Sequence, residues 1–146
     1  MHQSIINFNN IQSSIKSNQE QTNNKNNIKI IAVSKTFEIS HINPLIDYGH
    51  TDFGENKVQE AIEKWTDIKT KNNKLSLHLV GKLQSNKTKL ALKIFDYIHS
   101  LDSEKLANKI SEEQKKIDKK PKLFIQVNIG NEDQKSGVSP NKLKPF

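Results

Sequence analysis

One lysine stands where it could do chemistry of its own. Lys35 directly follows the run "IIAVS" at residues 30–34, which is typical of a buried strand. A lysine amine acts as a general base or as a nucleophile toward a carbonyl carbon once it is partly deprotonated, and desolvation or a cationic neighbour favours that state. At the end of a buried strand Lys35 could meet this condition. The alternative interpretation is a lysine that simply extends from a strand end into solvent.

Other residues that could contact a ligand stand at the ends of the later apolar runs. In parallel α/β proteins, ligands bind at the carboxyl ends of the strands, so these residues are candidates to line one site. They are Gly54, Glu55 and Asn56 after the second run, Gly81, Leu83, Gln84, Asn86 and Lys87 after the third with His78 inside it, His99 and Ser100 at the end of the fourth, and Asn128 and Lys135 after the fifth.

Alternating strands and helices must position these residues. The stretches that indicate strands are 28–34, 51–53, 75–80, 96–101 and 122–129. Apolar residues at helical spacing predict helices over 3–17, 40–48, 55–70 and 85–95, and a further helix capped by Ser103. This alternation predicts an α/β fold with a parallel sheet and right-handed crossovers. It does not separate a doubly wound open sheet from part of a (β/α)8 TIM barrel.

Chain length bears on this choice. Eight units at this spacing need ~200 residues or more, whereas the chain has 146. If the fold is a barrel, we expect only about the first five β/α units, with about three missing. The predicted organisation is one partial domain over 1–146, with an N-terminal helix and polar linker at 1–27 and the β/α units at 28–146.

The basic charge is built from lysine alone. All 23 basic residues are lysines, and the formal net charge is +7. Arginine is the usual bidentate reader of guanine, so its absence argues against specific nucleic-acid binding, while weak attraction to polyanions stays open. The sequence has no cysteine, no apolar run of membrane-spanning length and no signal-like N-terminus. These features predict a cytoplasmic protein that is not bound to a membrane.

The histidines and the known short motifs add little chemistry. The five histidines, at positions 2, 41, 50, 78 and 99, lack the spacing of a metal site. His78 lies between Leu77 and Leu79, which favours a hydrogen-bonded core histidine over a catalytic one. The stretch "GENKVQE" could be only a helix start with charges along it. The sequence contains no P-loop, G-x-G-x-x-G or G-x-S-x-G motif.

Five stretches taken together resemble the pyridoxal-phosphate homeostasis protein family. They are "AVSKT" (32–36), "DFGENKVQEA" (52–61), "HLVGKLQSNK" (78–87), "IHSLDS" (98–103) and "IQVNIGNEDQKSG" (125–137), in order and at similar spacing. The resemblance covers roughly residues 28–138. It implies a (β/α)8 barrel like the N-terminal domain of alanine racemase, which binds pyridoxal 5′-phosphate (PLP). It also implies a role in carrying or buffering this cofactor, without catalytic turnover.

The resemblance also implies a set of site residues. Lys35 matches the lysine that binds PLP as a Schiff base, and Asn56 matches a residue near the cofactor ring. His78, Ser100 and Asn128 match positions that line the barrel mouth.

The sequence departs from the family pattern at several points. Lys135 matches a second lysine that is an alternative cofactor contact, but Phe37 replaces a lysine common in the family and Leu77 replaces an aromatic residue. The Ser/Gly/Arg/Thr-containing segment that grips the phosphate has no counterpart in the 146 residues. Backbone N–H groups of such segments supply much of the affinity for a phosphate. We therefore expect a fragment or split half that binds PLP weakly through Lys35.

The sequence leaves two other functions open. A PLP-dependent amino-acid racemase would need an acid/base group opposite the lysine, which alanine racemases take from a second domain. A non-functional fragment would show only weak binding to polyanions. On the leading interpretation the partners are PLP and PLP-dependent apo-enzymes, and the chain is a monomer or is completed by a C-terminal chain.

Overall fold

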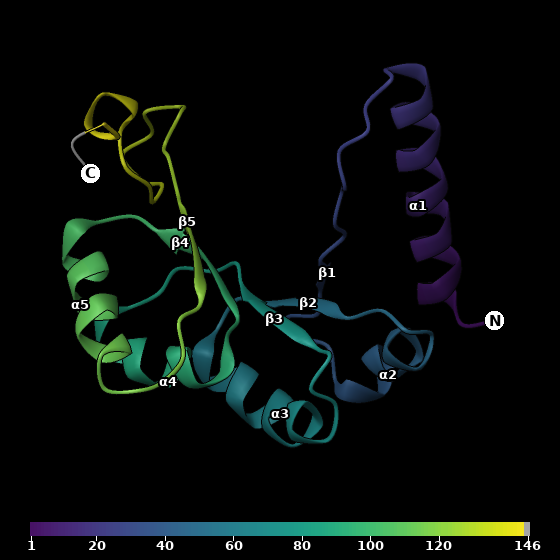
Figure 1. The fold of residues 1–146 in the computed structure, drawn as a ribbon, viewed down its shortest axis with the longest axis horizontal. Helices are drawn as coiled ribbons and strands as arrows, with labels where there is room; N and C mark the ends of the chain where they lie inside the picture. The colour runs from purple at the N-terminus through teal and green to yellow at the C-terminus, as the bar shows by residue number, and fades with distance from the viewer. Residues whose placement is uncertain (145–146) are drawn as a thin grey trace.

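The computed structural model describes residues 1–144 (Figure 1). Its helices are α1 (Gln3–Gln21), α2 (Ile39–Asp47), α3 (Val58–Lys71), α4 (Thr88–Ile94) and α5 (Glu104–Gln114), with short 3-10 helices η1 (Ser85–Lys87) and η2 (Pro140–Lys142). Its strands are β1 (Ala32–Val33), β2 (Asp52–Glu55), β3 (Ser76–Leu79), β4 (Tyr97–Leu101) and β5 (Lys122–Ile125). The predicted alternation of strands and helices is confirmed.

The five strands form one parallel sheet in the order β1-β2-β3-β4-β5. Each strand therefore pairs with the next strand along the chain. A doubly wound sheet reverses its order at a switch point, whereas a (β/α)8 barrel is wound sequentially. The strand order thus decides between the two architectures that the sequence leaves open, in favour of the barrel type.

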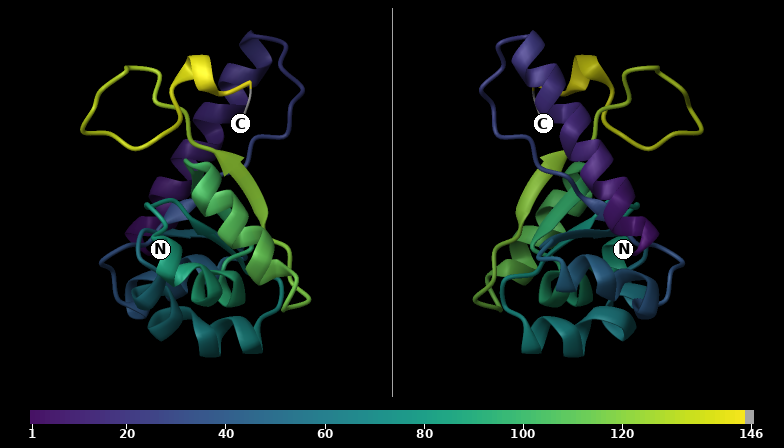
Figure 2. Two further views of the ribbon diagram at one scale, coloured as in Figure 1. Left: turned by 90° about the vertical axis from the view of Figure 1, so that its left-hand side faces the viewer. Right: turned by 90° about the vertical axis from the view of Figure 1, so that its right-hand side faces the viewer.

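Helices α2 to α5 cover one face of the sheet (Figures 1 and 2). Side chains of a strand point alternately to its two faces, so every second residue packs against these helices. Phe53 of β2 and Trp65 of α3 are fully buried there, with ring centroids 5.0 Å apart. Leu77, Leu79 and Ile98 extend the same core across β3 and β4. Trp65 is thus a core residue.

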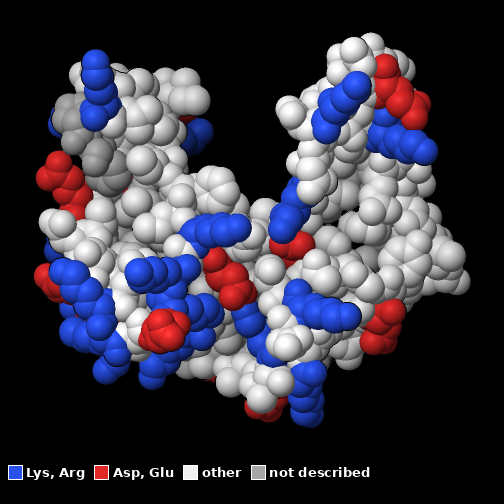
Figure 3. All heavy atoms as spheres, in the orientation of Figure 1, with Lys and Arg blue, Asp and Glu red and all other residues white. Residues whose placement is uncertain are grey.

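The other face of the sheet is hollowed, and we call it the concave face. Figure 3 shows the hollow between α1 on one side and the segment that follows β5 on the other. Phe124 of β5 and Val33 of β1 are 50% and 46% exposed. In a closed (β/α)8 barrel the corresponding side chains fill the interior.

Helix α1 is held at α2 and not within the core. No residue of α1 is buried. Phe8 packs against His50, with 4.7 Å between ring centroids, and the Tyr48 hydroxyl donates to the Asn9 side chain at 3.0 Å. The helix continues four residues past its predicted end at residue 17 and ends at Gln21.

Other elements also differ from the sequence-based prediction: β5 ends at Ile125 and not at residue 129, and α3 begins at Val58 and not at residue 55. β1 comprises only Ala32 and Val33, because β2 begins at Asp52 and the pairing of Ala32 with Phe53 leaves residues 28–30 without a partner strand. Helix α2 begins at Ile39, so Pro44 lies inside the helix and not in its first turn. The proline removes one backbone N–H donor from the helix.

Two further observations bear on the class of protein. Among residues 1–144, no helix combines the length and apolar character needed to cross a bilayer. The same part of the chain holds no group of three or more His, Cys, Asp or Glu side chains placed to bind a metal ion.

Candidate functional site

The carboxyl ends of the five parallel strands lie along one edge of the sheet, which we call the carboxyl edge. The predicted site residues all lie at or near it. Lys35 is two residues after β1, Asn56 directly follows β2, His78 and Ser100 are one residue before the ends of β3 and β4, and Asn128 is three residues after β5. Their surroundings differ, and so does the chemistry that each can perform.

Lys35 lies in a tight turn between β1 and α2, and its side chain is exposed. The residue before it, Ser34, is only 5% exposed. The residue after it, Thr36, has a φ of 65°, a left-handed conformation that few non-glycine residues adopt. Lys35 takes part in none of the ion pairs formed within residues 1–144. The side chain thus extends from the strand end into solvent and is accessible to a ligand, and it is not desolvated as a buried position would make it.

A buried carboxylate on β2 anchors the start of this turn. Glu55 is fully buried. Its Oε1 accepts hydrogen bonds from Ser34 Oγ at 2.7 Å and from Trp65 Nε1 at 2.9 Å. Lys64 Nζ lies 2.9 Å from the same oxygen, and this ion pair offsets the cost of burying the charge. The sequence predicts Glu55 as a strand-end candidate or as a charge at a helix start. It does not predict these contacts, because they depend on how α3 is oriented above β2.

His78 belongs to a chain of hydrogen bonds on the concave face. Its Nε2 lies 2.9 Å from Asp52 Oδ1 on β2, and its Nδ1 lies 2.9 Å from His99 Nε2 on β4. The ring stacks on Tyr97 at 4.2 Å between centroids. His78 is 1% exposed. The prediction of a hydrogen-bonded core histidine is confirmed, and both ring nitrogens are already engaged.

The electrostatics of this chain favour a neutral histidine beside an ionised carboxylate. Burial lowers the pKa of His78, and the hydrogen bond to Asp52 only partly opposes this. Burial alone would raise the pKa of Asp52, but hydrogen bonds from His78, Lys29 and Thr51 lower it overall. Burial and the neighbouring His78 lower the pKa of His99.

Asn56 lies against the loop that follows β3. A Cβ atom added at Gly81 would lie 2.2 Å from the Asn56 carbonyl oxygen, so only glycine permits this close approach. Asn56 also lines a pocket of about 370 Å³. The other residues of its lining are Lys57, Val58, Gln59, Lys82, Gln84 and Lys87. Three lysines, three side-chain amides and no carboxylate make this lining attractive to anions.

Ser100 and Asn128 have contrasting surroundings. Ser100 is fully buried, and its Oγ has no hydrogen-bond partner among the described residues. Asn128 instead organises the loop after β5. Its Nδ2 donates to the Glu132 carbonyl at 2.8 Å, and its Oδ1 accepts from the Glu132 backbone N–H at 3.3 Å.

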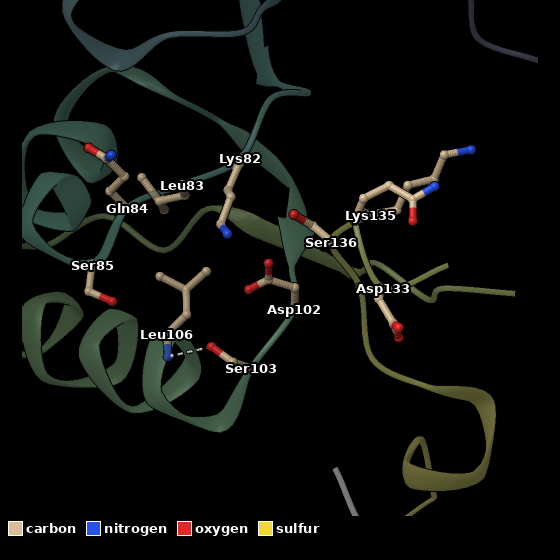
Figure 4. Close-up of a pocket in the computed structure, with 12 residues that line it drawn as sticks. Lys82, Leu83, Gln84, Ser85, Asp102, Ser103, Leu106, Asp133, Lys135 and Ser136 are labelled. Atoms are coloured by element: carbon tan, nitrogen blue, oxygen red, sulfur yellow. Dashed lines mark hydrogen bonds between the residues drawn. The ribbon is translucent and has the colours of Figure 1, made fainter. Parts of the chain in front are cut away.

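Lys82 is a residue of this edge that the sequence analysis did not select. It lines the pocket beside Asn56, a second pocket beside Asn128, and a third of about 430 Å³. In this third pocket, shown in Figure 4, its amine points toward Asp102, while Lys135 points away. Lys82 directly follows Gly81 in the loop after a predicted strand, and this position could have identified it.

The structure brings the predicted residues together only in part. Asn56 and Asn128 line different pockets, with Lys82 common to both. His78 is inside the sheet and reaches the surface only through His99. Lys35 presents an exposed side chain at the same edge. Joint contact of these residues with one ligand stays a prediction.

The fold defines the class of protein. Sequential winding of a parallel sheet, with helices α2 to α5 on one face, places the chain among the (β/α)8-barrel proteins. Its described residues hold four complete β/α units and the fifth strand, β5. A model of the family described as "Alanine racemase, N-terminal domain" matches residues 6–146. The chain belongs to this family.

Relatives within the family are named for cofactor homeostasis. The chain is 43% identical over 116 residues to the pyridoxal phosphate homeostasis protein of Pasteurella multocida, covering 80% of this chain and 50% of that protein. It is 41% identical over 126 residues to the protein of the same name from Haemophilus influenzae, covering 86% and 53%. The chain thus spans about half the length of these relatives.

Solved structures of similar fold agree with this placement. PipY of Synechococcus elongatus, solved without PLP, matches with a TM-score of 0.76 and 40% identity over 81% of this chain and 54% of that chain. The same protein solved with PLP bound matches with a TM-score of 0.74 and 36% identity, over 86% and 58%. The family resemblance seen in the sequence motifs is confirmed.

Proposed function

We propose that the chain is a PLP-binding protein of intracellular cofactor homeostasis, and that Lys35 holds the cofactor. The observation that carries the proposal is the exposed side chain of Lys35 in a restrained turn at the carboxyl edge. A relative of similar fold has been solved with PLP bound. The protein would act in the cytoplasm as one domain and would pass PLP to PLP-dependent apo-enzymes without turnover of its own.

The chemistry at Lys35 is that of a primary amine and an aldehyde. The amine adds to the aldehyde carbon of PLP, the carbonyl oxygen leaves as water, and a C=N bond remains. The reaction needs the neutral amine. Because the Lys35 side chain is exposed, the aldehyde can approach it from solvent. No acid/base pair is needed for this reversible capture.

The remaining residues would hold the rest of the cofactor. The pocket beside Asn56 is lined by lysines 57, 82 and 87, whose charges would attract the phosphate. Asn56 would contact the ring from the end of β2. Ser100 offers a buried hydroxyl whose hydrogen-bonding capacity is unused among the described residues. His78 would act through His99, and Asn128 through the loop that it organises.

The test is to locate the covalent attachment. The chain is titrated with PLP, the C=N bond is reduced with borohydride, and the modified lysine is identified by peptide mapping. We expect one dominant label at Lys35 and its loss in Lys35→Ala. Lys89→Ala, which removes an exposed lysine of α4 that lines none of the pockets described above, is the matched control and should keep the label at Lys35. Label spread evenly over many lysines and unchanged in Lys35→Ala would rule the proposal out.

A further inference from the structure

The turn that carries Lys35 is fastened to helix α3 on both sides of the lysine. On the N-terminal side, Lys64 Nζ donates a hydrogen bond to the carbonyl oxygen of Ser34 at 2.9 Å. On the C-terminal side, Glu60 Oε1 accepts a hydrogen bond from the backbone N–H of Thr36 at 2.8 Å. The residues on either side of Lys35 are therefore held, while its own side chain is left exposed.

The two residues of α3 also hold each other. Lys64 and Glu60 are one helical turn apart, and Lys64 Nζ lies 3.4 Å from Glu60 Oε1. Lys64 is in turn fixed by the buried carboxylate of Glu55 at 2.9 Å. Only 10% of the Lys64 side chain is exposed, so its ammonium is held among these oxygens. Glu60 is 30% exposed and forms the outer part of the arrangement.

Local preferences do not explain the conformation of this turn. Thr36 is β-branched and has a φ of 65°, which is unfavourable for such a residue. Conformations of this kind persist where surrounding contacts determine them, and they often occur at functional sites. The hydrogen bond to Thr36 is the main cause that lowers the pKa of Glu60, which means that the contact favours the carboxylate form. The contact from α3 thus favours a backbone conformation that the residue type of Thr36 does not.

We propose that Glu60 and Lys64 are positioning residues for Lys35. Neither touches the ligand; they fix the backbone on both sides of the lysine so that its amine is aimed along the carboxyl edge. The ligand is the aldehyde cofactor, so this inference rests on the proposed function. If the turn is already ordered, ligand binding does not have to restrict its backbone. The conformational entropy lost on fixing one residue corresponds to a factor of about 5 to 30 in affinity.

The variant Glu60→Ala tests the proposal in the whole chain. It removes the acceptor for Thr36 from a half-exposed position and leaves the buried Glu55–Lys64 pair in place. Glu63→Ala is the matched control, since Glu63 lies on the same helix and is bonded only to Gln59 among the described residues. We expect Glu60→Ala to bind PLP about 5- to 30-fold more weakly than Glu63→Ala, with the same unfolding midpoint in urea.

A second pair of variants separates positioning from general damage. In the Lys35→Ala background, Glu60→Ala should cause no further loss of PLP binding, because the residue acts through Lys35. Glu60→Gln keeps an acceptor oxygen and should restore most of the affinity. Equal affinities of Glu60→Ala and Glu63→Ala, with the label still at Lys35, would overturn the positioning role alone. Absence of the label at Lys35 in the unmodified chain would overturn both this role and the proposed function.

Discussion

His78 donates a hydrogen bond from Nε2 to the carboxylate of Asp52, 2.9 Å away on the neighbouring strand. Because Asp52 is kept ionised, the donor must be His78, and its Nδ1 is then the acceptor for the N–H of His99. Each hydrogen bond is thus donated toward β2: from His99 on β4 to His78 on β3, and from His78 to Asp52 on β2. This arrangement leaves Nδ1 of a neutral His99 without a proton and able to accept a hydrogen bond on the concave face.

Acidification is expected to destabilise the fold through the histidines. Burial lowers the pKa of His50, His78 and His99, so below about pH 6.5 the unfolded chain binds more protons than the folded chain does. Stability is therefore complete above the unfolded-state pKa and is lost as the pH falls through the lower folded-state values. Urea unfolding followed at a series of pH values from about 8 to 5 measures this slope.

The histidine variants show which residues cause the slope. His99→Gln should make stability depend less on pH, because one group with a lowered pKa is removed. His41→Gln changes an exposed histidine on α2 and serves as the control. A pH dependence that is the same in both variants would show that His99 is not a source of the slope.

The start of α5 depends on one side chain. Ser103 Oγ accepts a hydrogen bond from the Leu106 N–H at 3.2 Å and is the N-cap residue of the helix. Ser103→Ala should reduce the free energy of unfolding by about 1 kcal/mol, while Ser103→Asp should retain the cap and most of the stability. Urea unfolding monitored by circular dichroism compares the two. Equal losses in both variants would indicate that capping is not what Ser103 contributes.

Gly81 is required by the close approach to Asn56. In Gly81→Ala the new Cβ would lie 2.2 Å from a backbone oxygen, so the loop after β3 must move, at a cost of about 1–3 kcal/mol. Gly130→Ala is the control, because its Cβ would meet only the end of the Glu132 side chain, at 3.0 Å. That change should cost less than about 0.5 kcal/mol. The prediction fails if the two variants unfold at the same urea concentration.

The sequence predicts the elements better than it predicts the contacts between them. The strand at 75–80 and the Ser103 cap follow from local patterns, and the structure has β3 and α5 there. Whether Glu55 meets Trp65, or His78 meets His99, depends on helix orientation and strand register, which spacing along the chain does not determine. Lys35 could be selected because it directly follows an apolar run. The hydrogen bonds of Glu60 and Lys64 with the turn could not be predicted, because they join α3 to residues far away in the sequence.

The two faces of the sheet should respond differently to loss of an aromatic side chain. Phe53 is fully buried between β2 and α3, and Phe53→Ala should cost about 3–5 kcal/mol through lost burial and an internal cavity. Phe124 lies on the concave face, 50% exposed, stacked on His99 at 4.6 Å between centroids. Phe124→Ala should therefore cost only about 1 kcal/mol. Urea unfolding of both variants, with light scattering to record the association state, makes the comparison. A loss at Phe124 as large as that at Phe53 would mean that another molecule or chain covers the concave face in solution.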